Sequence, residues 1–188
     1  MEITNKNPKI IIIAGKARAG KDTTASFIKE YGEKNNLKVI NLQFSFYIKY
    51  YAKLISSWDG SEETKPRTLL QQLGTDIIRD KIDNYYFIKR IVDDIKVLSY
   101  FADIITISDA RLPEELDTIN STYPNVIKIN IVRPEFDNSL NQTESVHRTE
   151  TALDNYNKYN HEIINDGTLE ELKSNIFNLL DHDYGNEE

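Results

Sequence analysis

An apolar segment followed by a glycine-flanked loop constrains this chain more than any other feature of its sequence. Residues 10–14 read IIIIA, which suits a buried strand, and residues 15–23 follow directly with GKARAGKDT. A helix-like segment begins immediately after the loop. A strand, a glycine-flanked loop ending in lysine and then a helix is the layout of a phosphate-binding P-loop.

The residue types in this loop suit an anionic ligand. Two glycines let the backbone curl so that successive N–H groups point into one concavity, and the helix N-terminus adds partial positive charge. The lysine can reach the β- and γ-phosphates of a nucleoside triphosphate. We therefore predict an ATP site formed by Gly15, Lys16, Ala17, Arg18, Ala19, Gly20, Lys21, Asp22, Thr23 and Thr24. The alternative is a glycine-rich turn between strand and helix that binds no ligand.

The residue after Lys21 departs from the usual pattern, in which Ser or Thr ligates Mg²⁺ at that place. Here the place holds Asp22, and Thr23 comes one residue later. A carboxylate can hold Mg²⁺ directly or through water. We therefore predict a Mg²⁺ site at Asp22 and Thr23.

Length and composition exclude several classes of protein. The 188 residues suit one domain, which we predict to span residues 1–188, and the net charge of −7 argues against general nucleic-acid binding. The sequence contains no cysteine, so disulfides, Cys-based zinc sites and thiol catalysis are excluded. No segment reaches the ~18 consecutive apolar residues of a membrane helix, and no signal peptide is expected. We expect a cytoplasmic protein that binds small molecules.

Apolar runs alternate with helix-like segments along the chain. We predict strands at residues 9–14, 37–43, 103–108, 126–132 and 162–165, and helices at 23–34, 46–57, 66–80, 85–100, 113–122 and 169–180. This alternation is typical of an α/β fold with a five-stranded parallel sheet and helices on both faces. The polar stretch after residue 133 is predicted to be a lid loop at residues 133–150, with a solvated excursion as the alternative.

A P-loop alone does not distinguish ATPases, GTPases, kinases and transporter subunits. Further motifs follow it: LQQLGTD at 70–76, YYF at 85–87, SDAR at 108–111, VRP at 132–134 and INDGTLEEL at 164–172. Together with GKDTTA at 20–25, they resemble the deoxynucleoside monophosphate kinases of bacteriophage type, within the P-loop nucleoside monophosphate kinase group. The chain differs from them by a shorter segment around 58–65 and by Ala110, where Thr is common. The Lys-Asp loop and the Asp-x-Arg motif also resemble phosphomevalonate kinase.

The resemblance implies a P-loop kinase fold and transfer of the γ-phosphate of ATP to a deoxynucleoside monophosphate. It also implies a helical acceptor-binding region at residues 44–100 and an adenine site beside the backbone of Asn165 and Gly167. The acceptor-binding residues it implies in this region are Arg67, Gly74, Thr75, Asp76 and Arg79. Two alternatives stay open: a kinase of phosphomevalonate or dephospho-coenzyme A, and a nucleotide-binding regulatory module without turnover.

Transfer between two phosphates requires positioning and charge neutralisation more than acid–base help. Guanidinium groups at the ends of buried strands are therefore candidates. Arg111 and Asp109 end one strand and are assigned to the acceptor site, with an ion pair of Arg111 to Asp109 or Glu114 as the alternative for Arg111. Two roles stay open for Asp109: binding Mg²⁺ through water, or orienting Arg111 and the substrate. Arg133 ends another strand and is assigned to the transferring phosphate. The predicted catalytic residues are Lys21, Arg18, Arg111, Arg133 and Asp22.

Two aromatic segments allow two interpretations each. The rings at 85–87 either stack on a nucleobase or belong to the core, and aromatic clusters on a helix more often belong to the core. The rings within 44–51 lie either at a homodimer face or in the core on the lid side.

Overall fold

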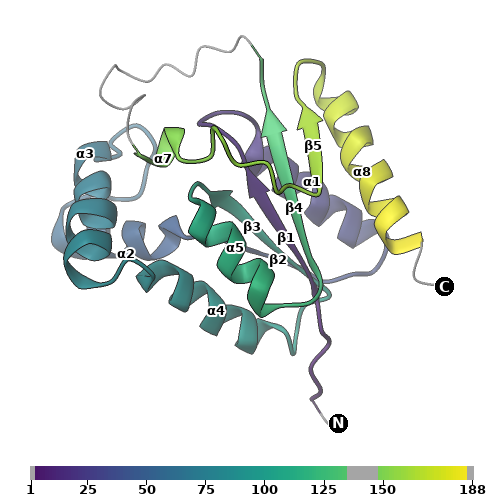
Figure 1. The fold of residues 1–188 in the computed structure, drawn as a ribbon, viewed down its shortest axis with the longest axis horizontal. Helices are drawn as coiled ribbons and strands as arrows, with labels where there is room; N and C mark the ends of the chain where they lie inside the picture. The colour runs from purple at the N-terminus through teal and green to yellow at the C-terminus, as the bar shows by residue number, and fades with distance from the viewer. Residues whose placement is uncertain (1–2, 135–147, 186–188) are drawn as a thin grey trace.

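Five strands form one parallel sheet in the order β2-β3-β1-β4-β5 (Figure 1). The structure is a computed structural model and describes residues 3–134 and 148–185. The strands are β1 (Lys9–Ala14), β2 (Val39–Leu42), β3 (Ile104–Ala110), β4 (Val126–Val132) and β5 (His161–Ile164). The predicted five-stranded parallel sheet is therefore confirmed, with strand ends within a few residues of those expected.

Helices cover both faces of this sheet, as the alternating pattern predicted (Figure 1). Helices α1 and α8 lie on one face, and α2, η1, α4 and α5 pack on the other. The bounds are α1 (Lys21–Lys34), α2 (Ser45–Ile55), α3 (Arg67–Gln71), η1 (Gln72–Ile82), α4 (Tyr86–Leu98), α5 (Pro113–Thr122), α7 (Arg148–Thr151) and α8 (Leu169–Gly185).

The central strand β1 separates two apolar cores. Its side chains alternate, so that Ile10 and Ile12 join the core under α4 and α5, whereas Ile11 and Ile13 join the core under α1 and α8. All four are at most 1% exposed. A strand buried on both faces reads as a continuous apolar run, which is why the sequence showed no alternation here.

The segment predicted as one helix at 66–80 consists of two parts. The α-helix α3 ends at Gln71, and the chain continues as the π-helix η1 to Ile82. At its end the backbone N–H of Asp83 donates to the carbonyl of Ile78, a spacing of five residues. The 3.6-residue period located the element but not its helix type. π-helical turns are rare and frequently occur at functional sites.

The predicted lid and the polar segment around 58–65 differ in how much of each the structure describes. Of the predicted lid, residues 135–147 lie outside the described residues. The segment around 58–65 is folded: Trp58 is 9% exposed and packs with Ala52 and Leu73 in a small core of its own.

Within the described ranges, no helix combines the length and apolarity that crossing a membrane requires.

Candidate functional site

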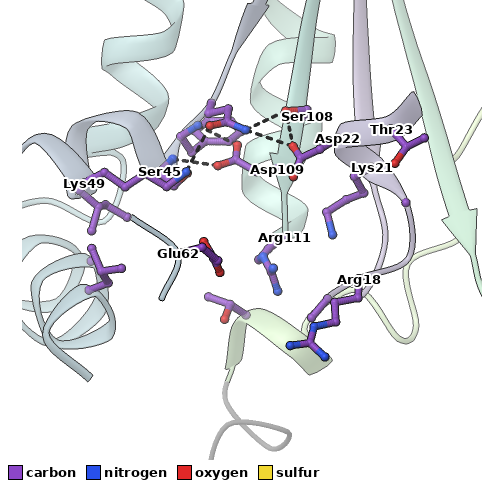
Figure 2. Close-up of a pocket in the computed structure, with 18 of the residues that line it drawn as sticks. Arg18, Lys21, Asp22, Thr23, Ser45, Lys49, Glu62, Ser108, Asp109 and Arg111 are labelled. Atoms are coloured by element: carbon purple, nitrogen blue, oxygen red, sulfur yellow. Dashed lines mark hydrogen bonds between the residues drawn. The ribbon is translucent and has the colours of Figure 1, made fainter. Parts of the chain in front are cut away.

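The carboxyl ends of the strands open onto one pocket of about 750 Å³. Strands β1 and β3 are neighbours, so the loops that follow them begin side by side at the same edge of the sheet. The opposite wall comes from α2, the 62–67 segment and η1. Figure 2 shows Lys21 and Arg111 extending into this space from the P-loop and from the end of β3. A pocket of this volume accommodates a ligand of nucleotide size.

The P-loop adopts backbone conformations that its glycines permit. Gly15 has φ 142°, and a Cβ there would collide with the backbone oxygen of Ile131 on β4. Gly20 has φ 108° and directly precedes α1. Arg18, at the tip, has φ 59°, a left-handed conformation that a side chain disfavours. Strained residues of this kind cluster at ligand-binding loops.

Lys21 lies under the P-loop and holds its shape. The ammonium donates to the carbonyl oxygens of Gly15 at 2.8 Å and Lys16 at 2.7 Å, and the residue is 7% exposed. Burial lowers the pKa of Lys21 to about 7, and the charge of Arg111 acts in the same direction. The carboxylates of Asp109 and Asp22 oppose this shift. A phosphate group entering the loop would favour the charged form.

Asp22 is oriented by two residues that the sequence did not single out. Its Oδ1 accepts hydrogen bonds from Gln43 Nε2 at 3.2 Å and from Ser108 Oγ at 3.3 Å. Gln43 also donates to Ser108 Oγ and accepts from Lys49 Nζ at 3.3 Å. In Figure 2, Asp22 points toward Ser108, and Thr23 lies on the far side of Asp22. Gln43 follows β2, and Ser108 lies near the end of β3, so their position at strand ends was the available signal.

Asp109 holds the start of α2. One carboxylate oxygen accepts from the backbone N–H of Phe44 at 2.8 Å, and the other accepts from that of Ser45 at 2.9 Å. These N–H groups belong to the first turn of a helix, which has no internal acceptors for them. A residue predicted to contact the acceptor therefore attaches one wall of the pocket to the end of β3.

A second buried carboxylate attaches the other part of that wall. Glu115 accepts from the backbone N–H groups of Arg111 at 2.8 Å and Leu112 at 3.1 Å, and from Arg79 Nη2 at 2.9 Å. Arg79 also donates to the carbonyl of Gly74 at 3.0 Å within η1. Burial raises the pKa of Glu115 to about 7, while Arg79 and both backbone donors oppose the rise. Arg79 is 9% exposed, so its guanidinium is buried in this wall of the pocket.

Removing one partner of this pair should destabilise the fold strongly. We expect Glu115→Ala to lower the free energy of unfolding by about 3–5 kcal/mol, because Arg79 would keep a buried charge without its partner. Urea denaturation followed by circular dichroism measures this. The exposed Asn120→Ala, on the same helix, is the control and should change stability by at most about 0.5 kcal/mol. A loss for Glu115→Ala as small as that of the control would contradict the buried-pair account.

The wall of the pocket formed by the 62–67 segment carries a group of charged side chains. Glu62 binds Lys65 through both carboxylate oxygens, at 3.0 and 2.9 Å, and lies 3.4 Å from Arg67. The hydrogen bond from Lys65 lowers the pKa of Glu62, and the charges of Arg67 and Lys49 lower it further. Figure 2 shows Glu62 between Lys49 and Arg111. Of this group only Arg67 had been predicted, because the others come together through the fold of the 58–65 segment.

The remaining predicted donor-side residues line the pocket or a neighbouring cavity. Ala17, Arg18, Gly20, Asp22, Thr23, Arg133, Asn165 and Gly167 line the main pocket together with Gly74 and Thr75. Gly15, Lys16 and Ala19 line an adjacent cavity of about 300 Å³, which Arg111 and Arg133 border as well. The P-loop thus lies between two cavities, and most residues of the predicted ATP site line one or the other.

Two predicted site residues do not reach the pocket. Thr24 is fully buried, because one step along α1 turns its side chain toward the core, and among the described residues its hydroxyl has no hydrogen-bond partner. Asp76 lies exposed on the outer face of η1. Within the aromatic segment, Phe87 is 1% exposed and belongs to the core, so base stacking by this ring is excluded.

The described residues contain no group of three or more His, Asp or Glu side chains arranged to hold a metal ion. Asp22 supplies one carboxylate at the pocket wall. This donor set suits Mg²⁺, which commonly takes one or two protein carboxylates and completes its shell with water and substrate phosphates.

Several solved structures with a similar fold are kinases. The adenosine phosphosulfate (APS) kinase CysC of Mycobacterium tuberculosis aligns over 93% of this chain and 98% of its own, with TM-score 0.56 and 12% identity. The shikimate kinase of Aquifex aeolicus aligns over 94% and 99%, with TM-score 0.51 and 16% identity. At such identities the likeness concerns the fold, and it confirms the predicted P-loop kinase fold.

Sequence comparison identifies the family. A protein of Acanthamoeba polyphaga mimivirus, with the provisional name deoxynucleotide monophosphate kinase, is 27% identical over 92% of this chain and 96% of its own length. The deoxynucleotide monophosphate kinase of Enterobacteria phage T4 is 33% identical over 61% of this chain and 44% of its own length. The family model for deoxynucleotide monophosphate kinase matches residues 39–176. With a P-loop before that range and motifs in the expected order within it, the chain belongs to the deoxynucleotide monophosphate kinase family of phosphotransferases.

Proposed function

We propose that this protein transfers the γ-phosphate of ATP to a deoxynucleoside monophosphate, giving the diphosphate and ADP. The observation that carries the proposal is the meeting of Lys21 and Arg111 in one pocket, from neighbouring strands. Transfer of a phosphoryl group between two anionic substrates requires cationic side chains from both binding sites at the point of transfer. In this proposal Lys21 belongs to the donor and Arg111 to the acceptor.

The donor side is built from the P-loop. Its N–H groups and the start of α1 hold the β- and γ-phosphates, while Lys21 exchanges its two carbonyl acceptors for phosphate oxygens. Arg18 and Arg133 border the same space and are assigned to the transferring phosphate. Asn165 and Gly167 line the pocket after β5 and are assigned to the adenine side.

The acceptor side is built from residues 44–100. Arg111 binds the acceptor's phosphate from the end of β3, and Arg67, Gly74 and Thr75 line the wall that receives the rest of the molecule. Arg79 and Asp109 act on this wall indirectly, since their charged groups are engaged with Glu115 and with α2. This differs from our expectation that both contact the acceptor.

The reaction requires little acid–base catalysis by the protein. A phosphomonoester has its second pKa at ~6, so the attacking oxygen is largely ionised at neutral pH. The side chains then hold two anions in line, neutralise their repulsion and exclude water. Mg²⁺, when bound, neutralises charge on the donor phosphates. Asp22 would hold it, directly or through water, and Gln43 and Ser108 fix the direction of that carboxylate.

Removal of the metal should abolish turnover. We expect no activity in excess EDTA and recovery when Mg²⁺ is restored. We expect Asp22→Asn to raise the Mg²⁺ concentration for half-maximal rate by about tenfold, because a neutral amide binds a hard cation more weakly than a carboxylate. Titration of the initial rate with Mg²⁺ measures both effects. Activity that survives EDTA, or an unchanged Mg²⁺ dependence in both Asp22→Asn and Thr23→Val, would refute this metal assignment.

The proposed reaction is tested by ADP release in a coupled assay. Ribonucleoside monophosphates, deoxynucleoside monophosphates, phosphomevalonate and dephospho-coenzyme A are each supplied with ATP and Mg²⁺. We expect turnover with at least one deoxynucleoside monophosphate. Turnover with phosphomevalonate or dephospho-coenzyme A alone would replace the acceptor, and binding of ATP with no turnover for any acceptor would indicate a regulatory module.

A homodimer is proposed on separate grounds. On α2, Phe46, Tyr50 and Leu54 are exposed at 59%, 52% and 64%, and their spacing of four residues places them on one face of the helix. A second copy of the chain would cover such a stripe. Sedimentation equilibrium of the protein and of Tyr50→Glu tests this, since a buried charge should shift a dimer toward monomer.

A further inference from the structure

The side chain of Asn165 contacts the P-loop rather than pointing only into the pocket. Its amide nitrogen Nδ2 donates to the carbonyl oxygen of Ala19 at 2.8 Å. The next residue, Gly20, adopts φ 108°, and a Cβ there would lie 2.6 Å from the same nitrogen. The glycine is therefore required by its conformation and also by the close approach of Asn165.

We propose that Asn165 is a positioning residue that sets the direction of the phosphate-binding N–H of Gly20. The described part of the chain contains no cis peptide bond, so the carbonyl of Ala19 and the N–H of Gly20 point in opposite directions from one rigid peptide unit. A hydrogen bond that fixes the carbonyl therefore also fixes the N–H. The amide of Asn165 holds this peptide with its N–H turned away from β5 and toward the triphosphate.

Asn165 itself is held in place before any nucleotide arrives. Its backbone N–H donates to the carbonyl of Val132 at 2.7 Å, which ties the end of β5 to the end of β4. Three residues later, Thr168 and Glu171 cap the start of α8: the N–H and hydroxyl of Thr168 donate to Glu171 Oε2, and the N–H of Glu171 donates to Thr168 Oγ1. The backbone that carries this amide is thus fixed by two strands and a capped helix, which lowers the ordering cost of nucleotide binding.

This inference rests on the proposed function, in which the P-loop holds the triphosphate of ATP. It separates two roles for Asn165, a contact with adenine and control of the phosphate-binding loop. Inorganic tripolyphosphate distinguishes them, because it presents the phosphates without the base or the sugar. Isothermal titration measures its affinity without turnover, so the result does not depend on which acceptor the enzyme uses.

We expect Asn165→Ala to weaken tripolyphosphate and ATP by the same factor, about tenfold, because one hydrogen bond that orients the loop is lost. We expect Asn165→Asp to weaken both further, since a carboxylate repels the carbonyl of Ala19 and the phosphates. The affinity for the acceptor monophosphate should stay within about twofold. Asn120→Ala, on an exposed face of α5, is the matched control and should leave all three affinities unchanged.

Three results would overturn the inference. The first is weaker ATP binding with unchanged tripolyphosphate binding, which would assign Asn165 to adenine. The second is an unchanged affinity for both ligands in Asn165→Ala and Asn165→Asp. The third is an equal loss for the acceptor monophosphate, which would indicate a general change of fold and would accompany a lower thermal unfolding midpoint.

Discussion

Replacing Lys21 with Met is expected to lower kcat at least ~100-fold, because loss of one preorganised electrostatic contact commonly costs ~2.7–4 kcal/mol of barrier. Lys21 is 7% exposed and donates to two P-loop carbonyls, so its ammonium lies at the centre of the loop. Methionine keeps the length and the apolar stem of lysine, so the loss is one of charge. Initial rates at saturating ATP and acceptor measure it.

The matched control is Lys29→Met, on the exposed part of α1, where the lysine lies 3.9 Å from Glu33. This control removes the same charge and should leave kcat unchanged. Circular dichroism confirms that both variants fold. A folded Lys21→Met protein with the turnover of the wild type would refute the P-loop assignment and with it the donor site.

Arg111→Ala should impair use of the acceptor, the substrate that receives the phosphate. We expect kcat/KM for the acceptor to fall by about 100-fold or more, with ATP affinity changed much less, because this guanidinium is assigned to the acceptor's phosphate. The site favours a strong contact, since burial is deep enough to lower the pKa of Arg111 against the opposing charges of Asp109, Glu115 and Asp22. Separate titrations of ATP and of each monophosphate decide the matter.

Two further variants sharpen this experiment. Arg111→Lys keeps the charge but cannot bind two phosphate oxygens in one plane, so it should recover only part of the lost rate. Arg67→Ala removes an arginine that is 46% exposed at its side chain and should cost far less. If ATP binding collapses in Arg111→Ala while monophosphate binding is unchanged, Arg111 belongs to the donor and the acceptor pocket is misplaced.

Local patterns in the sequence were sufficient to predict the sheet and to locate two of the cationic residues that line the pocket. Lys21 could be located because the P-loop is continuous in sequence, and Arg111 because it ends a buried apolar run. Both inferences use only neighbours along the chain and the rule that ligands collect at the carboxyl ends of parallel strands. The same rule located Asp109 correctly in space.

The sequence did not reveal contacts between side chains that are distant along the chain and meet only in the fold. Asp109 caps α2, and Gln43 reaches Asp22, through contacts between residues 64 and 21 positions apart. Thr24 and Asp76 were misplaced for another reason, since each residue of a helix turns its side chain by ~100° and one step decides between pocket and core. The π-helical turns of η1 also rotate its side chains away from the directions that an α-helix with 3.6 residues per turn would give them.

The small core around Trp58 has a consequence for how such an enzyme changes its substrate. Trp58, Ala52 and Leu73 form a cluster apart from the two cores of the sheet, and the indole donates to the carbonyl of Ser61 at 2.9 Å. The corner that presents Glu62 and Lys65 therefore has a small core of its own, which meets the larger core of the sheet through the partly buried Ile48 and Tyr51. We therefore expect insertions or replacements at this corner to alter which acceptor is bound while the sheet and the P-loop keep their structure.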